Sequence, residues 1–390
     1  MRTRPYEEHV TGGARIEYKV FVPSKKSAPA PGTDRLVDKI REGLFVTYLR
    51  NPMVGIDEVA RHAGVSTATV SRALSGNGHV SPSTRLKVEA SADELGYVVS
   101  STASSLASGR MKNIGVVVPF LNRWFFSSVV EGAQKALLRG GYDLTLYSLT
   151  GGEAERRSVF EHFLLRQRVD AVIAISLELT EDEVARLHAL QKPLVGIGGP
   201  IEGVRTLTVD DVAIARLATE HLLALGHTRI AHIGGNKDLD LDFHLPTNRR
   251  VGYEQALAEA GVVPDPALFQ AADFTMGGGY QAAKQLLGSP YDRPTAIVAA
   301  SDEMAIGSIL AARDLGLVVP RDVSVIGVDD YDLAEFFGLT TIAQFPQGQG
   351  EKAVEILLDR LRPGQNRLSS LNTPMPFELV VRSTTARPGE

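Results

Sequence analysis

The chain has 390 residues, 44% of them hydrophobic and 22% charged, a composition typical of globular proteins of two or three domains rather than of disordered or fibrous ones. It contains no cysteine, which excludes disulfides and thiolate metal sites, and it shows neither an apolar run of transmembrane length nor the apolar core of a signal peptide. We therefore expect a cytoplasmic protein with no membrane partner, and the net charge of −5 argues against a nucleic-acid-binding surface that covers the whole molecule.

Residues 1–52 follow no overall pattern, although residues 34–49 could form a short helix. The stretch S-K-K-S-A-P-A-P-G-T before this helix indicates a flexible segment. Met53 stands directly before V-G-I-D-E-V-A, so we expect either that Met53 is the native start or that residues 1–52 are a dispensable arm. The alternative is a basic arm that adds phosphate contacts, because this segment has ten Lys and Arg against six Asp and Glu.

Two short amphipathic helices come next. The first is predicted over about residues 56–63, with apolar side chains at helical spacing, and Gly64 ends it. Ser66 can cap the second helix, in which Val70 and Leu74 repeat at i, i+4. Two helices joined by a short turn that contains glycine are the helix-turn-helix layout, which places its second helix in the DNA major groove.

The outward side chains of the second helix are the candidate DNA contacts. Arg72 can make a bidentate contact with guanine, worth about 1–3 kcal/mol of discrimination. Thr67 and Ala68 are small enough to meet a thymine methyl, while Thr69 and Ser71 suit phosphate oxygens. With the cap included, the predicted DNA-binding residues of this helix are Ser66, Thr67, Ala68, Thr69, Ser71 and Arg72. The alternative is a surface helix of a small bundle with a solvated arginine.

A third helix is predicted from Pro82, with Ser81 as its cap, to about Leu95. Apolar residues of the three helices should form one small core, and we expect them to be Val59, Val65, Val70, Val80, Leu86 and Leu95. Three helices of this size bury little apolar surface, so this part should be only marginally stable alone. The serine-rich residues 98–111 that follow are a flexible linker by composition.

From Asn113 onward, buried strands alternate with amphipathic helices. Segments such as I-G-V-V-V-P, D-A-V-I-A-I-S and P-L-V-G-I predict a doubly wound parallel sheet. A second set of the same kind begins near Asp210, so we expect two lobes in series with a ligand-binding cleft at the strand carboxyl ends. The fold class is therefore a small all-α helix-turn-helix headpiece plus an α/β two-lobed effector domain of doubly wound parallel sheets.

Three phrases are more specific than these patterns: V-A-R-H-A-G-V-S-T-A-T-V-S-R-A-L, E-H-L-L-A-L-G-H-T-R-I-A-H-I-G-G and D-V-S-V-I-G-V-D-D. Through them the chain resembles the LacI/GalR family of bacterial transcription regulators over about residues 53–387. The resemblance implies a DNA-binding headpiece at 53–97 and a hinge at 98–111. It implies an effector-binding and dimerisation domain at 112–387, similar to the periplasmic sugar-binding proteins.

The resemblance also assigns a role to the linker. In the family this hinge becomes helical on DNA and wedges a leucine into the minor groove, and Leu106 matches that leucine. An apolar wedge unstacks a base step and permits a bent site. Val99, Ser100 and Ser104 stand where the family often has Pro, Asn and Arg, and the missing Arg removes a phosphate or groove contact.

By the same resemblance, the candidate effector-binding residues are Trp124, Phe125, Arg249, Phe274, Asp302 and Asp329. An arginine, carboxylates and aromatic rings suit a polyhydroxylated ligand, because charged groups fix hydroxyls and ring faces cover the apolar face of a sugar. Structural alternatives remain open for each: Asp329 as a turn residue, Arg249 in a surface ion pair, Asp302 as a helix cap, and the aromatic residues as core.

We predict a sequence-specific DNA-binding transcriptional regulator, a repressor, whose operator affinity is set by a sugar or sugar-like effector bound between the lobes. Residues 53–112 have six Lys and Arg against five Asp and Glu, so two weakly basic headpieces should act together, in a homodimer on a roughly palindromic operator. The motifs of common enzyme classes are missing, and we expect no catalysis, cofactor or metal site. The rival hypothesis is a soluble sugar-binding module, or a sugar-acting enzyme, with a helical interaction domain.

Overall fold

The computed structural model describes residues 54–75, 79–97, 110–149, 153–164, 168–177, 179–236, 244–362 and 371–389. Predictions about residues 1–53 and about most of the hinge, including Leu106, lie outside the described residues. The chain divides into two compact units, residues 1–100 and 101–390, and each is described by itself.

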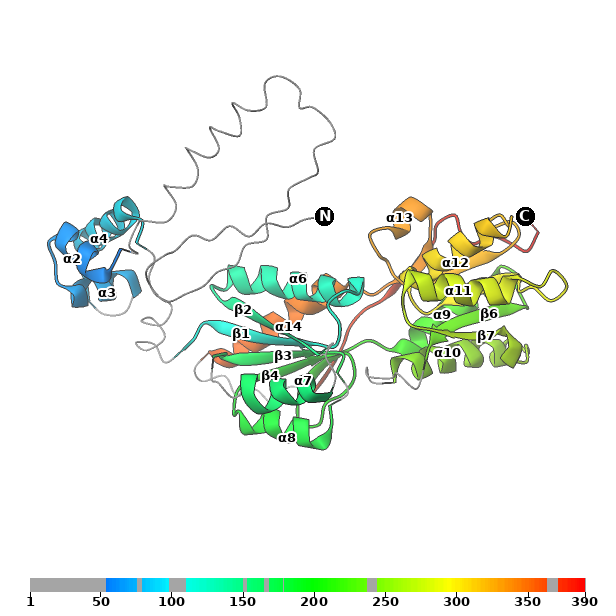
Figure 1. Cartoon of the computed structure of the whole chain (residues 1–390), viewed down its shortest axis with the longest axis horizontal. Coiled ribbons are helices and arrows are strands. Elements are labelled where there is room, and N and C mark those ends of the chain that lie inside the picture. The colour runs from blue at the N-terminus through cyan, green and yellow to red at the C-terminus, as the bar shows by residue number, and fades with distance from the viewer. Residues whose placement is uncertain are drawn as a thin grey trace, which may run out of the picture. The chain divides into compact units, whose positions relative to one another are not determined.

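The described part of the first unit forms the helices α2 (Ile56–Ala63), α3 (Thr67–Ser75) and α4 (Pro82–Leu95), shown in Figure 1. α2 ends at Gly64, whose φ of 62° is a left-handed conformation that glycine adopts without strain. The hydroxyl of Ser81 caps α4 by accepting a hydrogen bond from the Thr84 N–H at 3.2 Å. The predicted helix-turn-helix is confirmed.

Seven small or β-branched side chains form the buried core of this unit: Val59, Ala60, Ala63, Val70, Ala73, Val88 and Ala92. The prediction that Leu86 joins this core is wrong, because its side chain is 68% exposed. The buried stripe of α4 passes through Val88 and Ala92. At 3.6 residues per turn, a residue two positions before Val88 points about 200° away from it.

The second unit contains two six-stranded sheets, each the centre of one lobe. The N-lobe sheet has the order β11-β5-β4-β3-β1-β2, with β1 Asn113–Val118, β2 Asp143–Ser148, β3 Ala171–Ile175, β4 Leu194–Ile197, β5 Arg205–Thr208 and β11 Asn372–Pro374. The C-lobe sheet has the order β12-β10-β9-β8-β6-β7, with β6 Ile230–Gly235, β7 Phe269–Ala272, β8 Ala296–Ala299, β9 Ser324–Asp329, β10 Thr340–Ala343 and β12 Glu378–Val380. Neighbouring strands are parallel except β12, which is antiparallel to β10. The doubly wound architecture is confirmed.

Helices cover these sheets (Figure 1). Those of the N-lobe are α6 Trp124–Arg139, α7 Glu153–Ser158, the π-helical turn η1 Val159–Phe163, α8 Glu181–Ala189 and α14 Pro346–Leu361. Those of the C-lobe are α9 Asp211–Ala224, α10 Leu245–Glu259, the 3₁₀ turn η4 Pro266–Leu268, α11 Met276–Leu287, α12 Asp302–Asp314 and α13 Ala334–Phe337. In the N-lobe, α7 is a short α-helix that η1 continues as a π-helical turn.

The lobes are not built from two consecutive halves of the chain, as the alternation suggested. The chain passes from the N-lobe to the C-lobe between β5 and α9, returns between β10 and α14, and crosses again between β11 and β12. α14 packs closely on α6, since a Cβ on Gly132 would lie 2.0 Å from the Gln347 carbonyl oxygen. The late segment α14–β11 therefore completes the lobe that the early strands begin.

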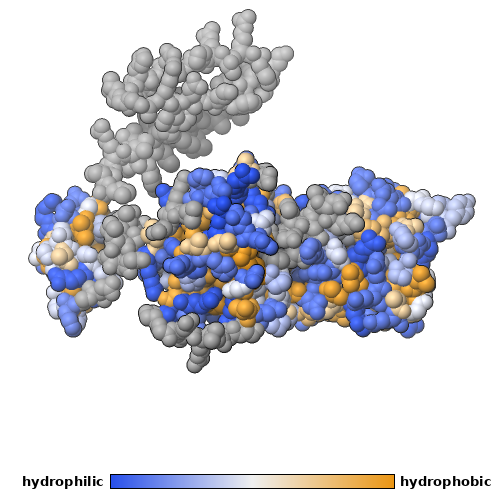
Figure 2. All heavy atoms as spheres, turned by 90° about the horizontal axis from the view of Figure 1, so that it is seen from below, coloured by the Kyte–Doolittle hydropathy of each residue, from blue (hydrophilic) through white to orange (hydrophobic). Residues whose placement is uncertain are grey.

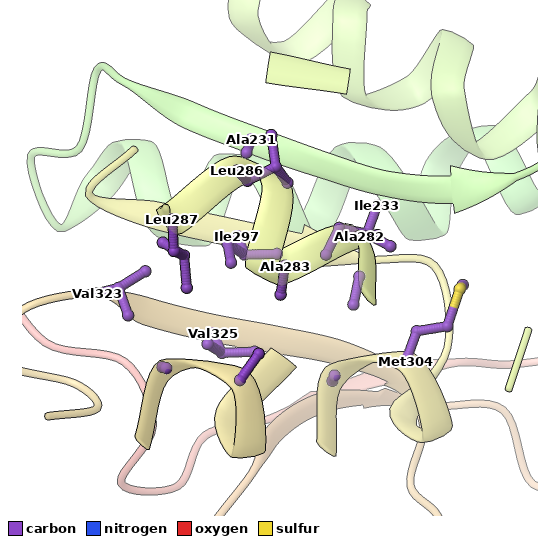
Figure 3. Close-up of a cluster of buried hydrophobic side chains, with 14 of the residues drawn as sticks. Ala231, Ile233, Ala282, Ala283, Leu286, Leu287, Ile297, Met304, Val323 and Val325 are labelled. Carbon is purple, nitrogen blue, oxygen red and sulfur yellow. The ribbon is translucent and has the colours of Figure 1, made fainter. Parts of the chain in front are cut away.

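Each lobe has its own buried core. Figure 3 shows Leu287 of α11 pointing toward Val323 and Val325 at the start of β9, and Leu286 beside Ala231 of β6, in the C-lobe. The face of the molecule in Figure 2 carries mostly hydrophilic residues, interrupted by smaller apolar patches. Among the described helices, none combines the length and the apolar character needed to cross a membrane.

A histidine in β6 is buried in the core of the C-lobe. His232 is fully buried, and its Nδ1 donates a hydrogen bond to the Val298 carbonyl at 3.0 Å, since a carbonyl can only accept. Its Nε2 has no partner among the described residues, and the ring stacks on Tyr253 with centroids 5.0 Å apart. Burial lowers the pKa of His232 from 6.5 to about 4, so the folded protein keeps this imidazole neutral.

We expect this histidine to destabilise the C-lobe as the pH falls from 6.5 to about 4. The unfolded chain takes up a proton over this window and the folded chain does not, so about 3 kcal/mol of stability is lost. Urea unfolding at several pH values should show that His232→Phe removes this part of the pH dependence. His62→Phe, at an exposed histidine, is the control and should leave the pH dependence of the unfolding free energy unchanged. If His232→Phe also left that pH dependence unchanged, the assignment would be contradicted.

Candidate functional site

The outer face of α3 is the candidate nucleic-acid interface. Val70 and Ala73 anchor the helix in the core, and the Arg85 guanidinium of α4 donates to the Ala73 carbonyl at 2.7 Å. The Ser66 hydroxyl accepts from the Thr69 N–H at 3.2 Å and so caps the helix. A short helix fixed in this way presents its outward side chains at defined positions.

The structure places the predicted contact residues on that face. Ser66, Thr67, Ala68, Ser71 and Arg72 are exposed and Thr69 is half-buried. The Arg72 Nε donates to the Ala68 carbonyl at 3.1 Å, which is its one hydrogen bond to the described residues. The remaining N–H groups of the guanidinium are thus available for a base edge.

A second candidate site lies where the strands of the C-lobe end. Arg249 of α10 is only 3% exposed, and its Nε donates to Asp211 Oδ1 at 2.9 Å, at the start of α9. Its Nη1 donates to the carbonyl of Ala300, directly after β8. Burial raises the pKa of Asp211, and the charge of Arg249 opposes this rise. The surface ion pair considered for Arg249 is therefore wrong, because the pair is buried.

Asp329 stands at the end of the neighbouring strand β9. It is 8% exposed, and the amide of Gln344, directly after β10, donates to its Oδ1 at 2.6 Å. Burial raises the pKa of Asp329 well above its usual range, with Arg249 lowering it and Asp302 raising it further. Asp329 and Asp330 both have positive φ, 131° and 58°. Consecutive non-glycine residues in this region store backbone strain, about 1–3 kcal/mol each, and such strain concentrates at functional sites.

Asp302 holds the end of β9 in place through hydrogen bonds to the segments beside it. Its carboxyl group is fully buried and accepts from the Thr341 hydroxyl at 2.6 Å and the Tyr331 N–H at 2.8 Å. Burial raises the pKa of Asp302 to about 7, against the effect of these hydrogen bonds. The cap of α12 is Ser301, whose hydroxyl accepts from the Met304 N–H at 3.3 Å. This arrangement favours a structural role for Asp302, and effector contact by it stays a prediction.

The predicted aromatic residues lie in three different settings. Trp124 is the first residue of α6 in the N-lobe, and its indole Nε1 donates to Asp332 Oδ2 of the C-lobe at 3.1 Å. Phe125 is half-buried and packs into the N-lobe core, and Phe274 is half-buried against the C-lobe core with a φ of 60°. The structure therefore brings Arg249, Asp329 and Asp302 into one cluster and gives Trp124 a contact between the lobes.

Sequence reasoning missed two members of the C-lobe cluster, Asp211 and Gln344. Asp211 follows the chain crossing between β5 and α9, and Gln344 follows the end of β10. Ligand-binding side chains gather at such positions in this architecture. Asp211 stands beside the cap Asp210 at the start of α9, and Gln344 follows T-T-I-A. The described residues contain no group of three or more His, Asp or Glu that could hold a metal ion.

Comparison with known proteins places this geometry in context. Residues 55–100 match the model of bacterial regulatory proteins of the lacI family, and residues 219–385 match a periplasmic binding protein-like domain. The HTH-type transcriptional repressor PurR of Vibrio atlanticus is 34% identical over 337 residues, which are 85% of this chain and 98% of that protein.

Solved structures agree with these matches over most of the chain. A lac repressor dimer bound to operator and the anti-inducer ONPF is 30% identical, with a TM-score of 0.74 and coverage of 86% of this chain and 100% of that one. A complex of the transcriptional regulator CelR with cellobiose is also 30% identical, with a TM-score of 0.62 and coverage of 85% and 99%.

Proposed function

Because the chain belongs to the LacI family of bacterial regulatory proteins and is a DNA-binding transcriptional regulator with a small-molecule effector, not an enzyme, we propose that it is a repressor controlled by a sugar-like ligand. The ligand is held in the C-lobe cluster of Arg249 and Asp329. The observation that carries this proposal is a buried guanidinium, which contacts the carbonyl directly after β8, and a buried carboxyl group at the end of the adjacent strand β9, beside strained backbone. The cellobiose complex of the related CelR supports the same class of ligand.

The DNA-binding half of the proposal rests on α3. We propose that two copies of the chain pair, as in the related lac repressor dimer, and place their α3 helices in successive major grooves of a roughly palindromic operator. Arg72 reads a guanine, and Ser66, Thr67, Ala68, Thr69 and Ser71 contact the thymine methyl and the phosphates around it. Leu106 enters the minor groove between the half-sites. A regulator of this kind acts beside the chromosome, so its proposed location is the cytoplasm.

Effector and operator are coupled through the two lobes. A ligand that contacts Arg249 and Asp329 on one side and the N-lobe on the other stabilises one arrangement of the lobes over others. The two hinges start from the N-lobes, so the lobe arrangement sets the spacing of the headpieces. The change in operator affinity that an effector can cause is limited by the difference between its affinities for these lobe arrangements.

A gel-shift experiment tests the whole proposal. The full chain is incubated with a library of random duplexes, and bound fragments are selected and sequenced, with and without a panel of sugars. A palindromic consensus whose binding changes with one sugar supports the proposal. Equal binding to all duplexes under every sugar contradicts it.

The charges of the C-lobe cluster predict an uncharged effector. Arg249 is paired with Asp211, and Arg382 is paired with Asp330 at 2.7 Å. Asp329 and Asp302 have no ion-pair partner within the described part of the chain. Burial raises the pKa of both carboxyl groups. An anionic ligand would therefore find no unpaired cation in this cluster, whereas a sugar hydroxyl can hydrogen-bond with Asp329 whether the carboxyl group is protonated or not.

We therefore expect free sugars to bind and their phosphate esters not to bind. In a thermal-shift series, ribose and ribose 5-phosphate, and glucose and glucose 6-phosphate, form matched pairs. The fitting sugar at about 100 times its Kd adds about 2.7 kcal/mol of stability and raises Tm by about 5–10 °C. A phosphate ester that stabilises more than its parent sugar would show that the charge argument is wrong.

A further inference from the structure

The start of α6 connects the two lobes through four contacts. The Trp124 indole Nε1 donates to Asp332 Oδ2 at 3.1 Å, and the indole lies against the ring of Tyr331 with centroids 5.3 Å apart. The Trp124 backbone N–H donates to Glu303 Oε1 at 3.3 Å. The Arg123 guanidinium donates to the Asp273 carbonyl at 3.0 Å. One two-residue segment of the N-lobe thus reaches three segments of the C-lobe.

These C-lobe partners all follow strands at the ligand-binding edge. Asp273 comes directly after β7, Glu303 lies in the first turn of α12 after β8, and Tyr331–Asp332 comes after β9. The last of these segments is continuous with the strained pair Asp329–Asp330. The contacts therefore lie next to the residues proposed to hold the effector, and each joins two protein groups directly.

The local chemistry of α6 explains why it needs a partner. The N-terminus of a helix has unpaired N–H groups and a partial positive charge. The cap residue Arg123 makes no side-chain capping bond, and the first turn of α6 contains no acidic residue. Glu303 of the other lobe supplies both the acceptor and the negative charge that α6 lacks. If the lobes separated, the first N–H of α6 would lose this acceptor and could hydrogen-bond only to water.

We propose that Trp124 and Arg123 form a latch that holds the lobes together in the absence of effector. This inference rests on the proposed function, because it assigns a regulatory task to the same cleft. Trp124 is then a positioning residue for the effector response rather than a wall of the ligand site. The latch groups are half-buried or exposed, so their hydrogen bonds are of the modest strength that thermal motion can break.

A consequence for effector affinity follows. A ligand that binds only the closed arrangement has an apparent Kd equal to its intrinsic Kd for that arrangement divided by the fraction of molecules already closed. A latch that raises this fraction tightens effector binding without any contact to the effector. Loss of the latch should weaken binding about tenfold if the closed fraction falls about tenfold.

The chain is well suited to a direct test because it contains no cysteine. Leu138→Cys on α6 and Tyr291→Cys after α11 are exposed positions, at 63% and 97%, one in each lobe. Spin labels at both sites, in full-length protein diluted with unlabelled chains, report the separation of the lobes within one molecule. The measurement is made without any sugar, in the otherwise unchanged chain and in Trp124→Ala, Asp332→Leu and Asp332→Asn.

We expect one narrow distance distribution in the unchanged chain and in Asp332→Asn, which keeps an acceptor oxygen. Trp124→Ala and Asp332→Leu should give a longer or broader distribution. Trp124 is the only tryptophan, so its fluorescence in Asp332→Leu should also become more accessible to acrylamide. Identical distributions in all four proteins would overturn the latch. Since no sugar is used, that result would leave the proposed effector site standing, and a sugar panel without hits would leave the latch standing.

Discussion

Replacement of Arg72 by alanine is expected to abolish discrimination at one base pair of each operator half-site. Arg72 is exposed on α3, and its guanidinium keeps four N–H donors available beyond its bond to the Ala68 carbonyl. A bidentate contact with guanine contributes about 1–3 kcal/mol, so two headpieces together should lose about 2–6 kcal/mol of specificity. The measurement is binding at fixed salt to the selected operator and to its single-base variants.

The matched variant for this experiment is Arg72→Lys. Lysine keeps the positive charge but lacks the planar fork that fits the guanine edge. We expect Arg72→Lys to retain affinity for random duplex and still lose the discrimination. If affinity for all sequences instead fell by the same factor in Arg72→Ala, Arg72 would be a phosphate contact, and its assigned role would be wrong.

Removal of the Arg249 charge should have the largest effect on the C-lobe. Arg249 and Asp211 form a buried pair, with side chains 4% and 18% exposed. Arg249→Met leaves the Asp211 carboxyl buried without its partner, which typically costs about 3–5 kcal/mol. We expect this loss in the free energy of unfolding by urea, together with loss of the response to the sugar that shifts the unchanged protein.

A double variant separates the two effects of Arg249. Arg249→Met with Asp211→Asn removes both charges and should recover much of the stability, since no uncompensated charge remains. It should not recover the sugar response, because the guanidinium is still missing. Arg216→Ala, on the same helix as Asp211, breaks exposed pairs with Glu220 and Glu259 and serves as the control with little change. Full recovery of the sugar response in the double variant would show that Arg249 does not contact the effector.

Local patterns predicted the headpiece almost residue by residue. The spacing of Val59, Ala63 and Val70, the helix-ending Gly64 and the cap Ser66 all act within a few residues of one another, so the sequence alone contains this information. The prediction that Leu86 belongs to the core was wrong because it considered the hydrophobicity of this residue but not its angular position on α4. The resemblance of short phrases to one family then indicated DNA binding, which periodicity alone leaves open.

The effector domain was predictable in class but not in assembly. Alternating strands and helices predict two doubly wound sheets, yet nothing local to α14 and β11 shows that they return to the first lobe. The same limit applies to the ligand cluster. Arg249 and Asp329 were identified by resemblance, whereas Asp211 and Gln344 become partners only when the strands are placed side by side. Contacts of Trp124 with Glu303 and Asp332 join residues about two hundred positions apart, a separation that no local pattern encodes.

The three chain crossings between the lobes restrict how such a receptor can be re-engineered. Neither lobe corresponds to one continuous stretch of the gene, because α14 and β11 are encoded after most of the C-lobe and β12 after both. A chimaera that imports a foreign ligand specificity as a single block ending at β10 would keep a terminal strand evolved for a different sheet. Exchange of effector preference between such regulators is therefore simplest through substitutions at the strand ends, with the scaffold left intact.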